Sequence, residues 1–141
     1  MDIHNEILVS GSLDKKIQVW NLETNRKLFE VAHDSVVWSV KIVNERFLSC
    51  GDKTVRIWSL KDGKLLHILS LSDWCHSFDL NSEKTLLAVA DATEVSIWDF
   101  SNLIQIKSIE LSETFDVRFN DPGNKLIIGQ NDGQVSIIDL Y

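Results

Sequence analysis

An alternating apolar pattern that returns about every 40 residues constrains this fold more than any other feature of the sequence. Its four copies end at Trp20, Trp58, Trp98 and Ile138, which are spaced 38, 40 and 40 residues apart. Each copy is a short run, such as residues 55–58, in which apolar and polar side chains alternate. Period-two alternation rich in β-branched residues is typical of a half-buried strand. The chain is therefore predicted to be built from copies of one β-unit.

Three further strand-like segments recur at fixed offsets from each of Trp20, Trp58 and Trp98. In the first unit, residues 7–10 precede the alternating run and residues 27–31 follow it, and residues 37–42 open the next unit. Short polar turns such as residues 131–133, with an Asp-Gly pair, join neighbouring segments as in β-hairpins. No segment shows a helical pattern. The sequence predicts an all-β fold, a partial β-propeller of about three and a half four-stranded antiparallel blades.

Residues 10–21, read as Ser-Gly-Ser-Leu-Asp-Lys-Lys-Ile-Gln-Val-Trp-Asn, resemble the WD-repeat family, with Ala32-His33 in place of the family's Gly-His. Residues 52–58 resemble it closely too. The resemblance extends over essentially the whole chain and implies one WD-repeat region, residues 1–141, with units at about 1–32, 33–71, 72–111 and 112–141. It weakens toward the end, where Asp91 is one position early and Ile138 replaces the tryptophan.

The resemblance implies that His33, Ser49, Asp52 and Trp58 form a buried hydrogen-bonded set, which is chemically reasonable because their polar groups can satisfy one another. Corresponding members in the other units are Asp14, Trp20 and Trp98. A remote alternative is a hydrolase that uses Ser49, His33 and Asp52. That alternative lacks a Gly-x-Ser-x-Gly elbow, and Ser49 is predicted in the middle of a strand. We therefore expect no catalytic residue here.

Trp38 and Trp74 do not occupy the family's structural tryptophan position. They lie at the entry to innermost strands, where propellers of this family direct side chains toward the top face and the central channel. Comparable positions in or beside these loops are Leu13, Val36, His76, Phe115 and Asn131. Large aromatic side chains beside acidic residues predict a protein-binding surface. The alternative is that both tryptophans pack between blades as irregular core.

Charge is distributed unevenly along the chain, which has 14 Lys and Arg against 21 Asp and Glu. Residues 1–64 carry ten basic and nine acidic side chains, whereas residues 65–141 carry four and twelve. An acidic surface repels nucleic acid and favours other proteins or peptides, basic or apolar, as partners. Cys50 and Cys75 lack the spacing of a metal site, so neither metal nor cofactor is expected. No apolar segment is long enough to span a membrane, and we expect a cytoplasmic or nuclear protein.

The length of 141 residues is too short for the closed ring of roughly seven blades that the resemblance implies. Residues 1–3 resemble the end of an innermost strand. The remaining blades are expected from a preceding part of the chain or, as the less favoured alternative, from a homodimer. The expected function is a non-enzymatic interaction scaffold or adaptor. Short turns such as residues 42–49 also resemble F-box/WD-repeat proteins, which leaves substrate recognition in a ubiquitin ligase receptor as the alternative.

Overall fold

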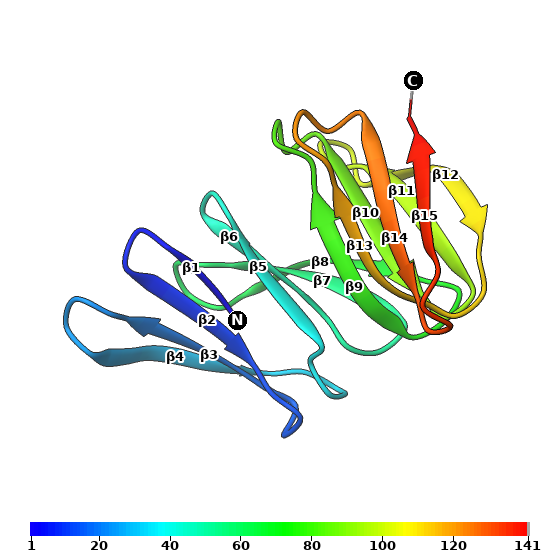
Figure 1. Cartoon of the computed structure of the whole chain (residues 1–141). Coiled ribbons are helices and arrows are strands. Elements are labelled where there is room, and N and C mark those ends of the chain that lie inside the picture. Colours follow the sequence, from blue (N-terminus) through cyan, green and yellow to red (C-terminus); the bar gives the residue numbers. More distant parts are fainter. Residues whose placement is uncertain (141) are drawn as a thin grey trace. The chain divides into compact units, whose positions relative to one another are not determined.

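The computed structural model describes residues 1–140, whose regular structure consists of β-strands (Figure 1). The fifteen strands form four antiparallel sheets, and within each sheet the spatial order of the strands follows the sequence. Three sheets have four strands and the last has three, so the all-β fold with about three and a half propeller blades is confirmed. Tyr141, the last residue of the predicted fourth unit, lies outside the described residues.

The strands of each sheet are consecutive in the chain. The first sheet contains β1 (Asp2–His4), β2 (Ile7–Gly11), β3 (Lys16–Asn21) and β4 (Arg26–Ala32). The second contains β5 (Ser39–Val43), β6 (Arg46–Cys50), β7 (Thr54–Ser59) and β8 (Leu65–Ser70). The third contains β9 (Cys75–Leu80), β10 (Leu86–Asp91), β11 (Glu94–Asp99) and β12 (Ile104–Glu110). The fourth contains β13 (Thr114–Phe119), β14 (Lys125–Gln130) and β15 (Val135–Asp139).

These sheets are grouped in two compact units along the chain. The first unit, Met1–Ser70, contains the first and second sheets, and the second unit begins at Leu71 and contains the third and fourth. Each unit has a pair of sheets, and a hydrophobic cluster draws residues from both members of the pair.

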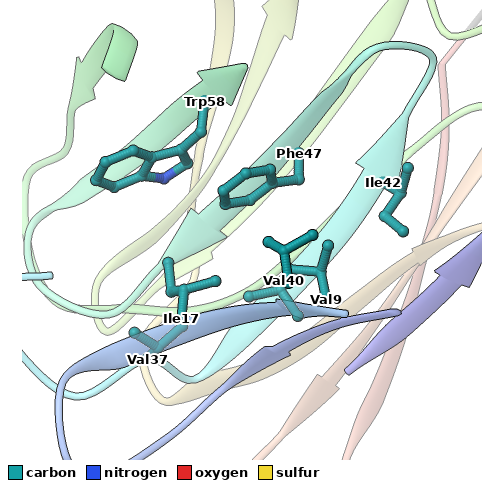
Figure 2. Packing of buried hydrophobic residues seen from close by; sticks show 8 residues of the cluster. Val9, Ile17, Val37, Val40, Ile42, Phe47 and Trp58 are labelled. Carbon is teal, nitrogen blue, oxygen red and sulfur yellow. The ribbon is translucent and has the colours of Figure 1, made fainter. Parts of the chain in front are cut away.

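In the first unit, the alternation of each strand turns its apolar side chains toward the partner sheet. Val9, Ile17 and Val19 of the first sheet are fully buried in one cluster with Phe47 and Trp58 of the second sheet. Figure 2 shows Val9, Ile17, Phe47 and Trp58 of this cluster. A polar link supplements this packing, because the backbone N–H of Ile42 donates to Asp2 Oδ2 at 2.7 Å. Burial of β-branched and aromatic side chains is thus the main force that holds the two sheets together.

The second unit repeats this arrangement. Val95 and Ile97 of the third sheet cluster with Val117, Leu126 and Ile128 of the fourth. The equivalent polar link is also present, since the backbone N–H of Phe119 donates to Asp79 Oδ2 at 2.9 Å. The repeat in sequence is therefore a repeat of side-chain contacts as well as of strands.

The pairing of each of the three tryptophan strands with its outer strand is irregular at the same place, where the outer strand has one extra residue. The register with the outer strand shifts between Val19 and Trp20, between Ile57 and Trp58, and between Ile97 and Trp98. Such a bulge adds an unpaired residue to one strand and increases its local twist. The indole therefore lies where its strand departs from regular pairing with the outer strand.

Candidate functional site

The indole of Trp58 has both a polar and an aromatic partner in the core. Its Nε1 donates a hydrogen bond to Ser49 Oγ at 2.8 Å, and its ring stacks on Phe47 with centroids 6.0 Å apart and planes 7° apart. Ser49 and Phe47 are both fully buried. The structure therefore brings together two of the four residues expected in the buried set.

His33 is buried beside Trp58 but takes no part in a closed hydrogen-bonded set. Its Nδ1 lies 4.0 Å from Asp52 Oδ2, which is too long for a hydrogen bond, and accepts only a 3.5 Å contact from the backbone N–H of Ser35. Its Nε2 is buried without a hydrogen-bond partner. Burial lowers the pKa of His33, and the nearby charge of Arg56 lowers it further. The ring is thus held in an environment that favours the neutral imidazole.

The Asp52 carboxylate accepts a hydrogen bond from Arg56 rather than from His33. Its Nη2 donates to Asp52 Oδ2 at 3.0 Å and to Asp34 Oδ2 at 2.6 Å. The hydrogen bond from Arg56 is the main cause that lowers the pKa of Asp34. The sequence did not predict these contacts of Arg56. A charged Arg56 between the apolar residues Val55 and Ile57 of an alternating strand was nevertheless a signal that it has acidic partners. The implied set of four is replaced by a Trp58–Ser49 pair and an Arg56–Asp52–Asp34 cluster.

The other expected members of such sets have local partners. Trp20 Nε1 donates to Gln18 Oε1 at 3.2 Å, and Trp98 Nε1 donates to Ser96 Oγ at 2.9 Å. Asp14 Oδ1 accepts from the backbone N–H of Lys16 at 3.0 Å within the turn between β2 and β3. In both tryptophan strands the acceptor therefore lies two residues before the indole on the same strand.

The geometry around Ser49 does not support the hydrolase alternative. Ser49 is fully buried and its oxygen accepts the indole hydrogen bond of Trp58. A serine nucleophile must be exposed to substrate and hydrogen-bonded to a general base. Ser49 therefore has a structural environment rather than a catalytic one.

In the first unit, the predicted binding residues lie in two loops. Trp38 and Leu13 are exposed, while Val36 is half-buried. The loop of Trp38 is fixed to the sheet, because its backbone N–H donates to the Cys50 carbonyl at 2.9 Å. An exposed indole on a fixed loop fits a surface position better than the irregular-core alternative.

In the second unit, the structure places His76 and Phe115 side by side. Their ring centroids are 5.8 Å apart, and His76 Nδ1 lies 2.9 Å from the Thr114 carbonyl, which can only accept a hydrogen bond. Trp74, two residues before His76, is exposed, and its backbone N–H donates to Asp73 Oδ1 at 2.9 Å. Phe115 is exposed as well, so the aromatic pair faces solvent on the Phe115 side.

Asn131 belongs to the same part of the second unit. Its backbone N–H donates to the Glu113 carbonyl at 2.9 Å, which ties the turn after β14 to the loop before β13. We call Trp74, His76, Phe115 and Asn131 the aromatic surface. Asp73, Glu113 and Asp132 neighbour its members in sequence.

Residues 1–140 contain no group of three or more His, Cys, Asp or Glu side chains that could hold a metal ion. Cys50 and Cys75 are both buried and free of a disulfide. None of the described residues belongs to a helix long and apolar enough to cross a membrane.

Comparison with known families assigns the repeat. The model of the "WD domain, G-beta repeat" family matches residues 2–21 and 25–59, which cover the first sheet and most of the second. Residues 2–21 and 25–59 therefore match WD repeats, and the chain has the fold of a WD40 β-propeller. Two solved structures share its fold with a TM-score of 0.87. The computationally designed Ika4 protein is 23% identical, and the alignment covers 99% of this chain and 89% of the Ika4 chain. The WD40 β-propeller domain of Doa1 is 19% identical, and the alignment covers 96% of this chain and 47% of the Doa1 chain.

Similar curated proteins are aligned with nearly the whole of this chain. The small ribosomal subunit protein RACK1y of Oryza sativa subsp. japonica is 26% identical across 92% of this chain and 43% of the rice protein. The WD repeat-containing protein 55 homolog of Drosophila melanogaster is 28% identical across 91% of this chain and 27% of the fly protein. The chain therefore spans less than half the length of these relatives.

Proposed function

We propose that this WD-repeat chain is a non-enzymatic scaffold that acts as one WD-repeat region and binds basic or apolar segments of partner proteins through its aromatic surface. The observation that carries the proposal is the exposure of Trp74 and Phe115, which leave 45% and 59% of their surface open to solvent. The loop of Trp74 is held to β10, because the backbone N–H of Asp73 donates to Asp91 Oδ2 at 3.2 Å, and the Phe115 ring lies beside His76 of β9. Rigid, exposed aromatic side chains lose little conformational entropy on binding and are frequent anchors in interfaces.

The charge of the second unit supports a basic partner. From residue 71 onward the chain has twelve acidic and four basic side chains. A Lys or Arg side chain over the face of an indole or phenyl ring gains a cation–π interaction, and acidic neighbours increase the local concentration of cations. Nucleic acid is disfavoured by the same field, because its phosphates carry negative charge.

The relatives support a scaffold in general terms. One is named a small ribosomal subunit protein and another a WD repeat-containing protein, and we place this chain among interaction proteins of the cytoplasm or nucleus. No observation on the fold or the relatives favours an F-box ubiquitin ligase receptor or a hydrolase, so neither is part of this proposal. Arg56 is buried and is bonded to the half-buried Asp52, and neither residue is assigned a binding role.

A peptide array tests the proposal. Nonamers rich in Lys and Arg, in Leu and Phe, or in Asp and Glu are probed with the 141-residue chain, and affinities are measured by calorimetry. We expect basic or apolar peptides to bind, and the double variant Trp74→Ala with Phe115→Ala to lose about tenfold or more in affinity. Ile104→Ala, at an exposed position of β12, is the matched control and should bind normally. Unchanged affinity in the folded double variant, or a preference for acidic peptides, would contradict the proposal.

A further inference from the structure

Three apolar positions that repeat in every sheet are buried in three sheets and exposed in the fourth. The buried triplets are Val9, Ile17 and Val19 in the first sheet, Leu48, Val55 and Ile57 in the second, and Ala88, Val95 and Ile97 in the third. The equivalence follows from the strand pairing, because Val9–Val19, Leu48–Ile57, Ala88–Ile97 and Ile127–Ile137 are all directly paired residues. In the fourth sheet, Ile127, Val135 and Ile137 expose 37%, 65% and 63% of their surface. We call this triplet the tail face.

In the first sheet, a different set of apolar positions is exposed, on a row of paired residues. In the second and third sheets, a row of paired residues that ends in tryptophan is buried, namely Ile42–Phe47–Trp58 and Leu80–Leu87–Trp98. The equivalent row of the first sheet is Ile3–Leu8–Trp20. Ile3 is 57% exposed, and Leu8 and Trp20 are only partly buried. We call this row the head face.

The molecule itself shows what such faces pack against. In the first unit, the row of the second sheet lies in one cluster with the triplet of the first sheet (Figure 2). In the second unit, the row of the fourth sheet, Phe119–Leu126–Ile138, lies in one cluster with residues of the triplet of the third. A row therefore packs on a triplet in both units. The head face is a row without a triplet, and the tail face is a triplet without a row.

Charge favours the same pairing between molecules. The head face belongs to the first unit, with ten basic and nine acidic side chains, and the tail face to the second, with four and twelve. Contact between two tail faces brings two acidic units together and is opposed by repulsion. Contact between two head faces sets a row against a row, a pairing that neither unit contains. Head against tail satisfies both packing and charge.

We propose that a second copy of this chain covers these faces, with the head face of one molecule against the tail face of the other. The contact is heterologous, because the two molecules contribute different surfaces. This inference does not depend on the aromatic surface or on the peptides it binds. A further blade of a longer polypeptide is the competing occupant, and in that case the 141-residue chain alone stays monomeric.

Sedimentation velocity of the 141-residue chain, at concentrations up to about 100 μM, tests the proposal with two variants. Ile3→Asp places a charge on the head face only, and Ile137→Asp places one on the tail face only. We expect the unmodified chain to associate and each variant alone to sediment as a monomer of 16.1 kDa. An equal mixture of the two variants keeps one intact head and one intact tail, so it should form a pair. No face-to-same-face contact gives this restoration.

Ile106→Asp is the matched control. Ile106 lies on β12, outside both faces, and has the same exposed fraction as Ile3, 57%. This variant should associate like the unmodified chain, and circular dichroism should show that all three variants remain folded, because each change is at an exposed position. A monomeric unmodified chain overturns the proposal. So does a single variant that still associates, or a mixture that stays monomeric.

Discussion

Trp58 is the residue at which packing and hydrogen bonding coincide most closely. It is buried, it stacks on Phe47, and it donates to Ser49. Trp58→Ala should lower the free energy of unfolding by about 3–5 kcal/mol, because it leaves a large cavity. Trp38→Ala is the matched control at an exposed indole, and it should cost no more than about 0.5 kcal/mol. Urea unfolding followed by circular dichroism measures both, and equal losses would refute this assignment of core and surface.

His33 makes stability depend on pH. Its pKa is lowered in the folded state, first by burial and then by Arg56, so the unfolded chain binds a proton more readily. The contribution of neutral His33 to the free energy of unfolding is fully present above the pKa of histidine in the unfolded chain, about 6.5. It is lost as the pH falls below that value. The urea midpoint should therefore decrease between pH 7.5 and pH 5.

His33→Gln separates this effect from the titration of other groups. The variant should show a flatter midpoint over the same pH range, because the group that is buried neutral is gone. An equally steep pH dependence in His33→Gln would assign the proton to another group. Arg56→Met offers a second check, because removal of the guanidinium should raise the pKa of His33 in an NMR titration.

At the scale of elements, Gly51 shows how tightly one sheet is fitted to the loop before it. A Cβ built at Gly51 would lie 1.8 Å from the Val36 carbonyl oxygen, a backbone atom that cannot turn aside. Gly51→Ala should cost about 1–3 kcal/mol through forced backbone movement. Gly129→Ala on β14 is the control, because nothing lies within 4 Å of its added methyl group, and its stability should be unchanged or slightly higher. Thermal unfolding distinguishes the two, and a neutral Gly51→Ala would show that the loop yields.

The sequence predicted the strands because each has an intrinsic period, and the period of about 40 residues predicted how the strands are grouped. Trp38 and Trp74 were separated from the structural tryptophans by position alone, and both are exposed. The partner of Asp52 could not be predicted in this way. His33 and Arg56 both lie near its carboxylate, and a difference of about one ångström, 4.0 Å against 3.0 Å, decides which one bonds. The register shift beside Trp20, Trp58 and Trp98 also has no residue signature in the sequence.

At the scale of the whole molecule, the net charge of −7 is concentrated in the second unit. Like charges confined to one compact unit repel one another, and unfolding relieves that repulsion. Two exposed ion pairs of this unit oppose it, Arg118–Asp116 and Lys125–Asp139. Surface pairs of this kind contribute about 0–1 kcal/mol each, so repulsion should dominate the response to salt.

Salt should therefore stabilise the monomer. In the Ile3→Asp variant, which removes the expected association, NaCl raised from about 10 mM to 150 mM shortens the Debye length from about 30 Å to 8 Å. We expect a gain of about 1 kcal/mol, which raises the melting temperature by roughly 2–5 °C in a chain of this size. The gain should shrink when Glu83→Lys and Asp121→Lys are added, because both acids are exposed and belong to the acidic unit. A melting temperature that falls with salt would show instead that the ion pairs outweigh the repulsion.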